Sequence, residues 1–296
     1  MTQANSIALA PSAARRAASP TLRRSLVWVA VYGVLVVAVV VLLFPFFWMV
    51  STSLKTPNEM FARGVTMLPK HWTLQNYVNV WTQTDFPIYF WNSFKVATVS
   101  TLLALIVSIY AAYAMARISF PGRNLFGIAL LVTQMFPGIL FVIPLFRIIK
   151  ALGLFDTQYA LIIAYTAYSL PFGIWMMRGF FAAIPIDLED AAAVDGATMI
   201  GTLHRVILPL AGPGIAAVVM YNFIRSWNEF LFALVFLQSN RLFTLPLGLA
   251  AFEGDYSFRW DLLMAGASSV SLPILVVFLV MNRFIVQGLL GGAVKG

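Results

Sequence analysis

Residues 26–50 read LVWVAVYGVLVVAVVVLLFPFFWMV, a run of 25 residues without a charged side chain. An α-helix needs about 20 apolar residues to cross the hydrocarbon core of a bilayer, so this run is long enough to span one. It is too long for the apolar region of a signal peptide, and residues 45–49, Pro-Phe-Phe-Trp-Met, offer no small-residue cleavage site. The run therefore predicts a transmembrane helix that is retained.

The composition of the whole chain indicates a membrane protein. Of its 296 residues, 61% are hydrophobic and 10% are charged, whereas a soluble domain carries about 25% charged residues. Because there is no cysteine, disulfides, thiolate metal sites and cysteine nucleophiles are excluded. We expect an all-α membrane protein with six transmembrane helices, the other five near residues 92–116, 125–146, 159–177, 213–237 and 262–281. Four prolines are expected to kink or interrupt these helices: Pro137, Pro144, Pro171 and Pro273.

The basic residues predict the orientation in the membrane. Lys and Arg are in excess on cytoplasmic loops, and the N-terminal tail carries Arg15, Arg16, Arg23 and Arg24. We therefore expect both termini in the cytoplasm, and we attribute the net charge of +8 to this bias and not to nucleic-acid binding. The predicted organisation is a disordered tail at 1–25 and a transmembrane domain at 26–296, with an external loop at 51–91 and a cytoplasmic loop at 178–212.

The cytoplasmic loop contains a predicted pair of short helices. Asp187 is a suitable N-cap for the first helix, and Asp190 stands where the acid of a capping box belongs. Gly196 is expected to end that helix as a C′ glycine, and Thr198 to cap the second helix. Two interpretations are open: a compact knob that inserts into a partner's groove and pairs with its arginines, or a simple connection between two spans.

This loop resembles the EAA loop of ABC-importer permeases, whose pattern is Glu-Ala-Ala, three residues, Gly, nine residues, Ile, any residue, Leu-Pro. The pattern falls on 190–192, Gly196, Val206 and 208–209, with Asp190 in place of Glu and Val206 in place of Ile. Residues 112–123, 227–230 and 288–296 resemble further motifs of the maltose-type sugar importers, so the resemblance covers residues 26–296. The residues expected to couple to the ATPase are Asp187, Glu189, Asp190, Ala191, Ala192, Asp195, Gly196, Leu208 and Pro209.

The resemblance implies the fold of a type I ABC importer permease in the plasma (inner) membrane. It also implies a complex with a second permease subunit, a dimer of ATPase subunits and an external solute-binding protein. ATP and Mg²⁺ are expected on the ATPase, because this chain has no Gly-x-x-x-x-Gly-Lys-Ser/Thr phosphate loop. The chain itself is expected to bind no metal or cofactor and to be a transport subunit without a catalytic site.

The implied cargo is a sugar. With 14 arginines and 5 lysines, the chain has the composition of a protein from a GC-rich source, which a mycobacterial trehalose importer would fit. No residue separates trehalose from maltose, other oligosaccharides or glycerol phosphates.

The fifth predicted span carries a polar stripe. Asn222, Arg225, Ser226 and Glu229 are spaced i, i+3, i+4 and i+7, which places them on one face of a continuous helix. This face either lines the path of a sugar or holds helices together through an Arg225–Glu229 ion pair. The candidate residues for the substrate path are Asn222, Arg225, Ser226, Trp227, Asn228 and Glu229.

Two other classes of protein remain as alternatives. A stand-alone secondary transporter usually shows an internal repeat and membrane acids for ion coupling, whereas Glu229 is the one clear deep acid. An intramembrane enzyme would need paired acids, histidine or cysteine within a span, and both His71 and His204 fall in loops.

Overall fold

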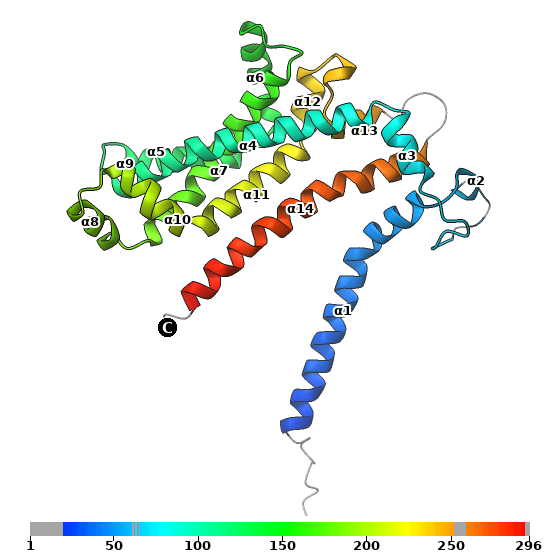
Figure 1. The fold of residues 1–296 in the computed structure, drawn as a ribbon, viewed down its shortest axis with the longest axis horizontal. Coiled ribbons are helices and arrows are strands. Elements are labelled where there is room, and N and C mark those ends of the chain that lie inside the picture. The colour runs from blue at the N-terminus through cyan, green and yellow to red at the C-terminus, as the bar shows by residue number, and fades with distance from the viewer. Residues whose placement is uncertain (1–19, 61, 63, 65, 252–258, 294–296) are drawn as a thin grey trace, which may run out of the picture. The chain divides into compact units, whose positions relative to one another are not determined.

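The computed structural model describes residues 20–60, 62, 64, 66–251 and 259–293, and every regular element in this part of the chain is a helix (Figure 1). The expected all-α fold is therefore confirmed for these residues. Most of the predicted tail, residues 1–19, lies outside them. The chain divides into two compact units, Met1–Trp48 and Met49–Gly296, and each is considered by itself.

Several helices are long enough to be transmembrane. Four described segments can cross a bilayer by length and composition: Val27–Ser53, Phe86–Arg117, Gln158–Ala183 and Trp260–Val286. Two strongly bent helix pairs raise the number to six if each pair counts as one span. These counts agree with the six expected spans, although the fifth span differs in shape from the prediction.

The first helix, α1 (Pro20–Ser53), contains the opening apolar run. Its side chains from residue 27 to residue 47 are exposed on every side of the helix. A helix that is apolar all round has no single face to turn toward a neighbour, so it suits surroundings that are apolar on all sides, such as lipid.

Four helices build the core of the second unit: α4 (Phe86–Arg117), α7 (Gln158–Ala183), α11 (Gly212–Trp227) and α14 (Trp260–Ala293). α4 and α7 run side by side in the same direction, since Thr166 donates to the Ser100 carbonyl at one end and Tyr113 packs edge-on against Phe181 at the other. Close approach depends on Gly173, where an added Cβ would lie 2.4 Å from the Ser108 hydroxyl oxygen.

The third predicted span is interrupted at Pro137, as expected. α5 (Arg123–Met135) and α6 (Ile139–Ala151) meet at an angle of 105°. The break falls at Pro137, as expected for a proline that cannot continue a helix, and Phe136 before it is extended with ψ 131°. The other three prolines lie inside helices: Pro144 in α6, Pro171 in α7 and Pro273 in α14.

The fifth predicted span is also interrupted, which corrects the prediction of a continuous helix over 213–237. α11 ends at Trp227, and the short α12 covers Leu231–Phe236. At its other end α11 is bent by 79° from the helical segment Met199–Leu210 that precedes it.

The loop predicted at 51–91 is shorter than expected. α4 begins at Phe86, so the segment ends there and not at residue 91, and it contains the short helices α2 (Pro57–Met60) and α3 (Gln75–Thr82). The start of α4 is fixed to the chain after α12: the Asn92 amide donates to the carbonyls of Arg241 and Phe243, each at 2.9 Å. Arg241 lies in the 3₁₀ turn Asn240–Leu242 and Phe243 directly follows it, before α13 (Leu245–Ala251).

Asp156 joins the α6–α7 connection to the segment after α12. Its carboxylate accepts hydrogen bonds from the backbone N–H groups of Gln238 (2.8 Å) and Ser239 (2.9 Å), and its own N–H donates to the Phe236 carbonyl. Its φ of 57° lies in the left-handed region that few non-glycine residues adopt. Burial acts to raise the pKa of the carboxyl, but the hydrogen bonds from Ser239 and Gln238 outweigh it and lower the pKa.

We expect Asp156→Ala to lower the free energy of unfolding by about 1–2 kcal/mol, because two backbone donors lose a charged but partly hydrated acceptor. Thermal unfolding in detergent would measure the change, and Asp156→Asn, which keeps a carbonyl acceptor and tolerates the left-handed conformation, should lose less. Because the folded pKa is lowered, this contribution is present above the unfolded pKa of about 3.9 and is lost as the pH falls through the folded pKa. Equal melting temperatures of wild type and Asp156→Ala at pH 7 would contradict the expectation.

Candidate functional site

The predicted helix-turn-helix is present. α8 (Asp187–Val194) is followed by the short α9 (Met199–Thr202). Gly196 has a φ of 81°, its N–H donates to the Ala193 carbonyl, and the next N–H, of Ala197, donates to the Ala192 carbonyl. These two bonds are those of a Schellman motif, which confirms the predicted C′ glycine. The Thr198 hydroxyl accepts from the Gly201 N–H at 3.2 Å, which confirms the second cap.

The predicted capping of the first helix was wrong. The Ile186 carbonyl already accepts from the N–H groups of Glu189 (2.8 Å) and Asp190 (3.1 Å), so the helical turn starts one residue earlier than expected. Asp187 is consequently the first helical residue and its side chain caps no N–H group. Asp187, Glu189 and Asp190 still place negative charge on the first turn, where the helix dipole favours it.

Glu189 fixes α8 to the ends of two core helices. Its carboxylate accepts from Arg117 Nε at 2.5 Å and from the Tyr113 hydroxyl at 2.7 Å, both near the end of α4. A second nitrogen of Arg117 donates to the Ile184 carbonyl at 2.8 Å, just after α7. Only 11% of the Arg117 side chain and 14% of the Glu189 side chain are exposed, so water screens the pair weakly. We name Tyr113, Arg117, Ile184 and Glu189 the tether.

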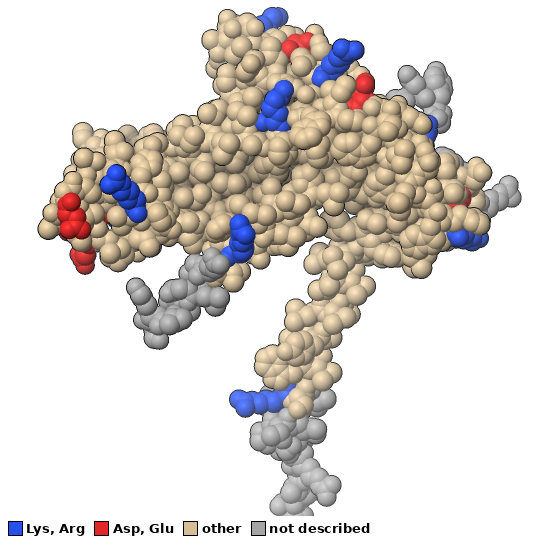
Figure 2. Space-filling model, viewed as in Figure 1, with Lys and Arg blue, Asp and Glu red and all other residues tan. Residues whose placement is uncertain are grey.

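The outer surface of the helix-turn-helix is open. Asp190, the acid at the EAA position, is exposed and accepts no hydrogen bond from any described residue, in contrast to Glu189 beside it. Acidic side chains are exposed at the α8 end of the second unit (Figure 2). Asp187, Ala191 and Asp195 are exposed as well, and the exposed fraction of Val194 is 89%. This end therefore offers a partner both negative charge and apolar contact.

The remaining coupling residues lie deeper in the segment. A π-helical turn, Leu203–Ile207, follows α9 and leads into α10 (Leu208–Leu210), which contains Leu208 and Pro209. α8 contacts this π-helical turn, and Ala192 of α8 is half-buried. The helix-turn-helix therefore packs against the segment that leads into α11.

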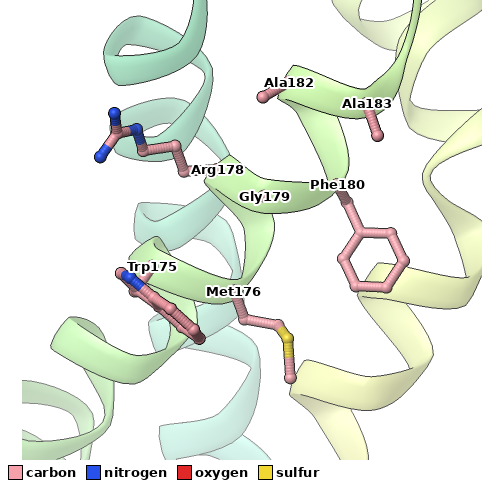
Figure 3. Close-up of a pocket in the computed structure, with 7 residues that line it drawn as sticks. All are labelled: Trp175, Met176, Arg178, Gly179, Phe180, Ala182 and Ala183. Carbon is pink, nitrogen blue, oxygen red and sulfur yellow. The ribbon is translucent and has the colours of Figure 1, made fainter.

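A cavity of about 540 Å³ lies along the last turns of α7, just before α8 (Figure 3). Gly179 is central to it, Arg178 and Phe180 point to opposite sides, and an added Cβ at Gly179 would meet no atom within 4 Å. None of the predicted coupling or path residues is in its lining, which consists of Trp175, Met176, Arg178, Gly179, Phe180, Ala182 and Ala183.

The structure divides the predicted polar stripe into two groups. Asn222 and Trp227 are completely buried and Ser226 is nearly so, with the Ser226 hydroxyl 3.3 Å from that of Ser100 on α4. These three side chains pack between helices. Asn228 is exposed and donates to the Ile224 carbonyl at the end of α11.

The expected ion pair between Arg225 and Glu229 is absent from the described residues. Glu229 lies beyond the end of α11, where its carboxylate accepts from the Tyr165 hydroxyl (2.7 Å) and from the Phe232 N–H at the start of α12. Arg225 instead lies over the ring of Tyr168, with its guanidinium carbon 3.8 Å from the ring centre. The interruption of the helix after Trp227 therefore separates two charges that a continuous helix would bring together.

Sequence reasoning missed the aromatic partners Tyr113, Tyr165 and Tyr168. Each lies within an apolar span, where a polar group is unusual enough to serve as a signal. Their partners are 57 to 76 residues away along the chain, so local spacing could not identify them.

Known proteins resemble this chain over most of its length. Residues 104–291 match the family described as binding-protein-dependent transport system inner membrane component. The trehalose transport system permease protein SugB of Mycobacterium tuberculosis is 40% identical over 93% of this chain and 99% of its own. The inner membrane ABC transporter permease protein YcjP of Escherichia coli is 39% identical with the same coverage. A chain of a bacterial ABC transporter that imports the acidic polysaccharide alginate superposes with a TM-score of 0.76 at 25% identity, covering 90% of this chain and 98% of that one. The chain therefore belongs to the family of binding-protein-dependent ABC transporter permeases.

Proposed function

We propose that this chain is one of two permease subunits of an ATP-driven importer and that α8 and α9 transmit the movement of a separate ATPase dimer to the membrane helices. The tether carries this proposal, because it joins the exposed α8 to the ends of α4 and α7 through groups that are almost excluded from water. A loop that only connected two spans would need no such attachment. Asp190, Ala191, Asp195 and Gly196 form the docking surface.

The proposed cargo is a saccharide that an external solute-binding protein delivers. The family supports the binding protein, and the relative from Mycobacterium tuberculosis supports trehalose as one candidate. Both termini would lie in the cytoplasm, with ATP and Mg²⁺ on the ATPase subunits. A glycerol phosphate importer of the same architecture is the second candidate for the cargo.

Co-purification tests the docking surface. Wild-type chain, tagged and solubilised from its native membrane, is expected to bring down an ATPase and a second permease. Asp190→Lys should reduce the ATPase recovered about tenfold by placing a positive charge at the interface. Asp85→Lys, the same change of charge before the start of α4, is the matched control and should recover as much ATPase as wild type.

Two results would count against the proposal. A chain that purifies alone and moves solute in liposomes without ATP would be a secondary transporter. Equal loss of the ATPase in both lysine variants would show that its recovery depends on the net charge of the chain and not on the surface of α8.

A further inference from the structure

Arg225 is a membrane-embedded cation without an acidic partner. Among the described residues two ion pairs form, Arg117–Glu189 and Arg259–Asp261, and Arg225 belongs to neither. Its guanidinium is held by aromatic groups: it covers the Tyr168 ring and donates to the Tyr221 hydroxyl at 3.3 Å. A cation within a span is costly unless it faces a polar cavity or a ligand, so its position needs an explanation beyond packing.

Arg225 lies where two interrupted helices meet α7. Tyr168 on α7 stands beside the α5–α6 break, since a Cβ added to Gly138 would lie 2.9 Å from the Tyr168 hydroxyl oxygen. One turn earlier on α7, Tyr165 holds Glu229 at the α11–α12 break. In transporters, discontinuous helices form solute sites, because irregular backbone within a membrane is stable where it lines a cavity.

The aromatic groups around Arg225 are accessible, unlike the rest of the polar stripe. The exposed fraction of Tyr221 is 37%, and Arg225 and Tyr168 are half-buried. Tyr221 stacks on Phe172 with 3.8 Å between the ring centres, which extends the aromatic surface along α7 and α11. Asn222, one residue further along α11, is completely buried.

We propose that Arg225, Tyr168 and Tyr221 form this subunit's half of a saccharide site on the transport path, which deepens and rests on the proposed importer function. The remaining guanidinium N–H groups and the Tyr221 O–H donate to sugar oxygens, and the exposed part of the Tyr221 ring contacts an apolar face of the sugar. The half-site offers donors and a positive charge but no carboxylate. It therefore binds oxygen acceptors, and an acidic saccharide more strongly than a neutral one.

The absence of native cysteine allows a direct test. The Tyr221→Cys variant of the complete complex is reconstituted in liposomes. It is then reacted with two water-soluble methanethiosulfonates, the anionic sulfonatoethyl reagent and the cationic trimethylammonium-ethyl reagent. Both should label Cys at 221, whereas the anion-to-cation rate ratio should fall about tenfold when Arg225→Gln is added. Rates are normalised to Gln83→Cys, an exposed position after α3.

Control positions separate a water-lined path from general exposure. Val218→Cys, completely buried on the same helix, and Leu275→Cys, 51% exposed on the apolar surface of α14, should remain unlabelled in the liposomes. Phe172→Cys is a second reporter from α7 in case the change at Tyr221 disturbs folding.

The possible outcomes either support or overturn the site. Labelling at 221 and 172 with a ratio that depends on Arg225 supports it. The site is overturned if neither position is labelled, both with ATP and vanadate and without nucleotide. It is also overturned if the anion-to-cation rate ratio is the same with and without Arg225→Gln. Recovery of the ATPase with the same preparations tests the importer function separately, so failure of one proposal is distinguishable from failure of the other.

Discussion

Glu189→Arg is expected to reduce ATP-driven uptake about a hundredfold or more while the core of the protein remains inserted. The substitution places two guanidinium groups together at a site where 11% of the Arg117 side chain is exposed. Breaking a buried ion pair costs about 3–5 kcal/mol, because the remaining charge keeps its desolvation penalty. α8 should then detach from α4, so that nucleotide-driven movement no longer reaches the spans. Uptake of radiolabelled sugar into proteoliposomes, measured beside ATP hydrolysis, checks this expectation.

A charge exchange is the control for this experiment. Arg117→Glu together with Glu189→Arg restores opposite charges at the same place and should recover part of the uptake, although the new arginine cannot accept from Tyr113. Normal uptake by the Glu189→Arg single variant in an intact complex would show that the tether does not transmit movement.

Gly196→Val is expected to lower uptake more than tenfold with little change in the thermal stability of the membrane core. At a φ of 81° a β-branched side chain is strained, so the two hydrogen bonds that close α8 should be lost and the direction of α9 should change. The residue is exposed and lies outside the spans, which is why the damage should stay local. Uptake and thermal unfolding measured on the same preparation separate the two effects.

The matched control is Gly196→Asn, because asparagine tolerates the left-handed conformation better than other residues with a side chain. It should retain most of the uptake. If valine is tolerated as well as asparagine, the turn between α8 and α9 does not have to be fixed for transport.

The sequence predicts those features that depend on neighbours along the chain. Long apolar runs locate the membrane helices, since the bilayer sets their length. Gly196 and Thr198 follow from the requirements of helix ends, which are satisfied within five residues, and the structure confirms both. The EAA pattern is local as well, and its acidic position falls on the exposed Asp190 of α8.

The sequence does not predict features that depend on distant contacts. The end of α11 at Trp227 is stabilised by Glu229, whose carboxylate is fixed by Tyr165 on another helix and by the first turn of α12. The polar residues at 222–229 also fit one face of an uninterrupted helix, so the sequence alone did not reveal the interruption. Glu189 was likewise expected at a docking surface, and its pairing with Arg117, 72 residues earlier, requires knowledge of the packing.

The length of α4 has a mechanical consequence. The helix has 32 residues, or about 48 Å at 1.5 Å per residue, and it is held at both ends: by the tether at Arg117 and by the Asn92 amide near its start. Such a helix is long enough to cross a bilayer with its two attachment points near opposite ends. A tilt of about 5° about one end would displace the other by about 4 Å. If α8 moves with an ATPase as proposed, α4 would carry that movement from the tether toward Asn92 without any change in the helix itself.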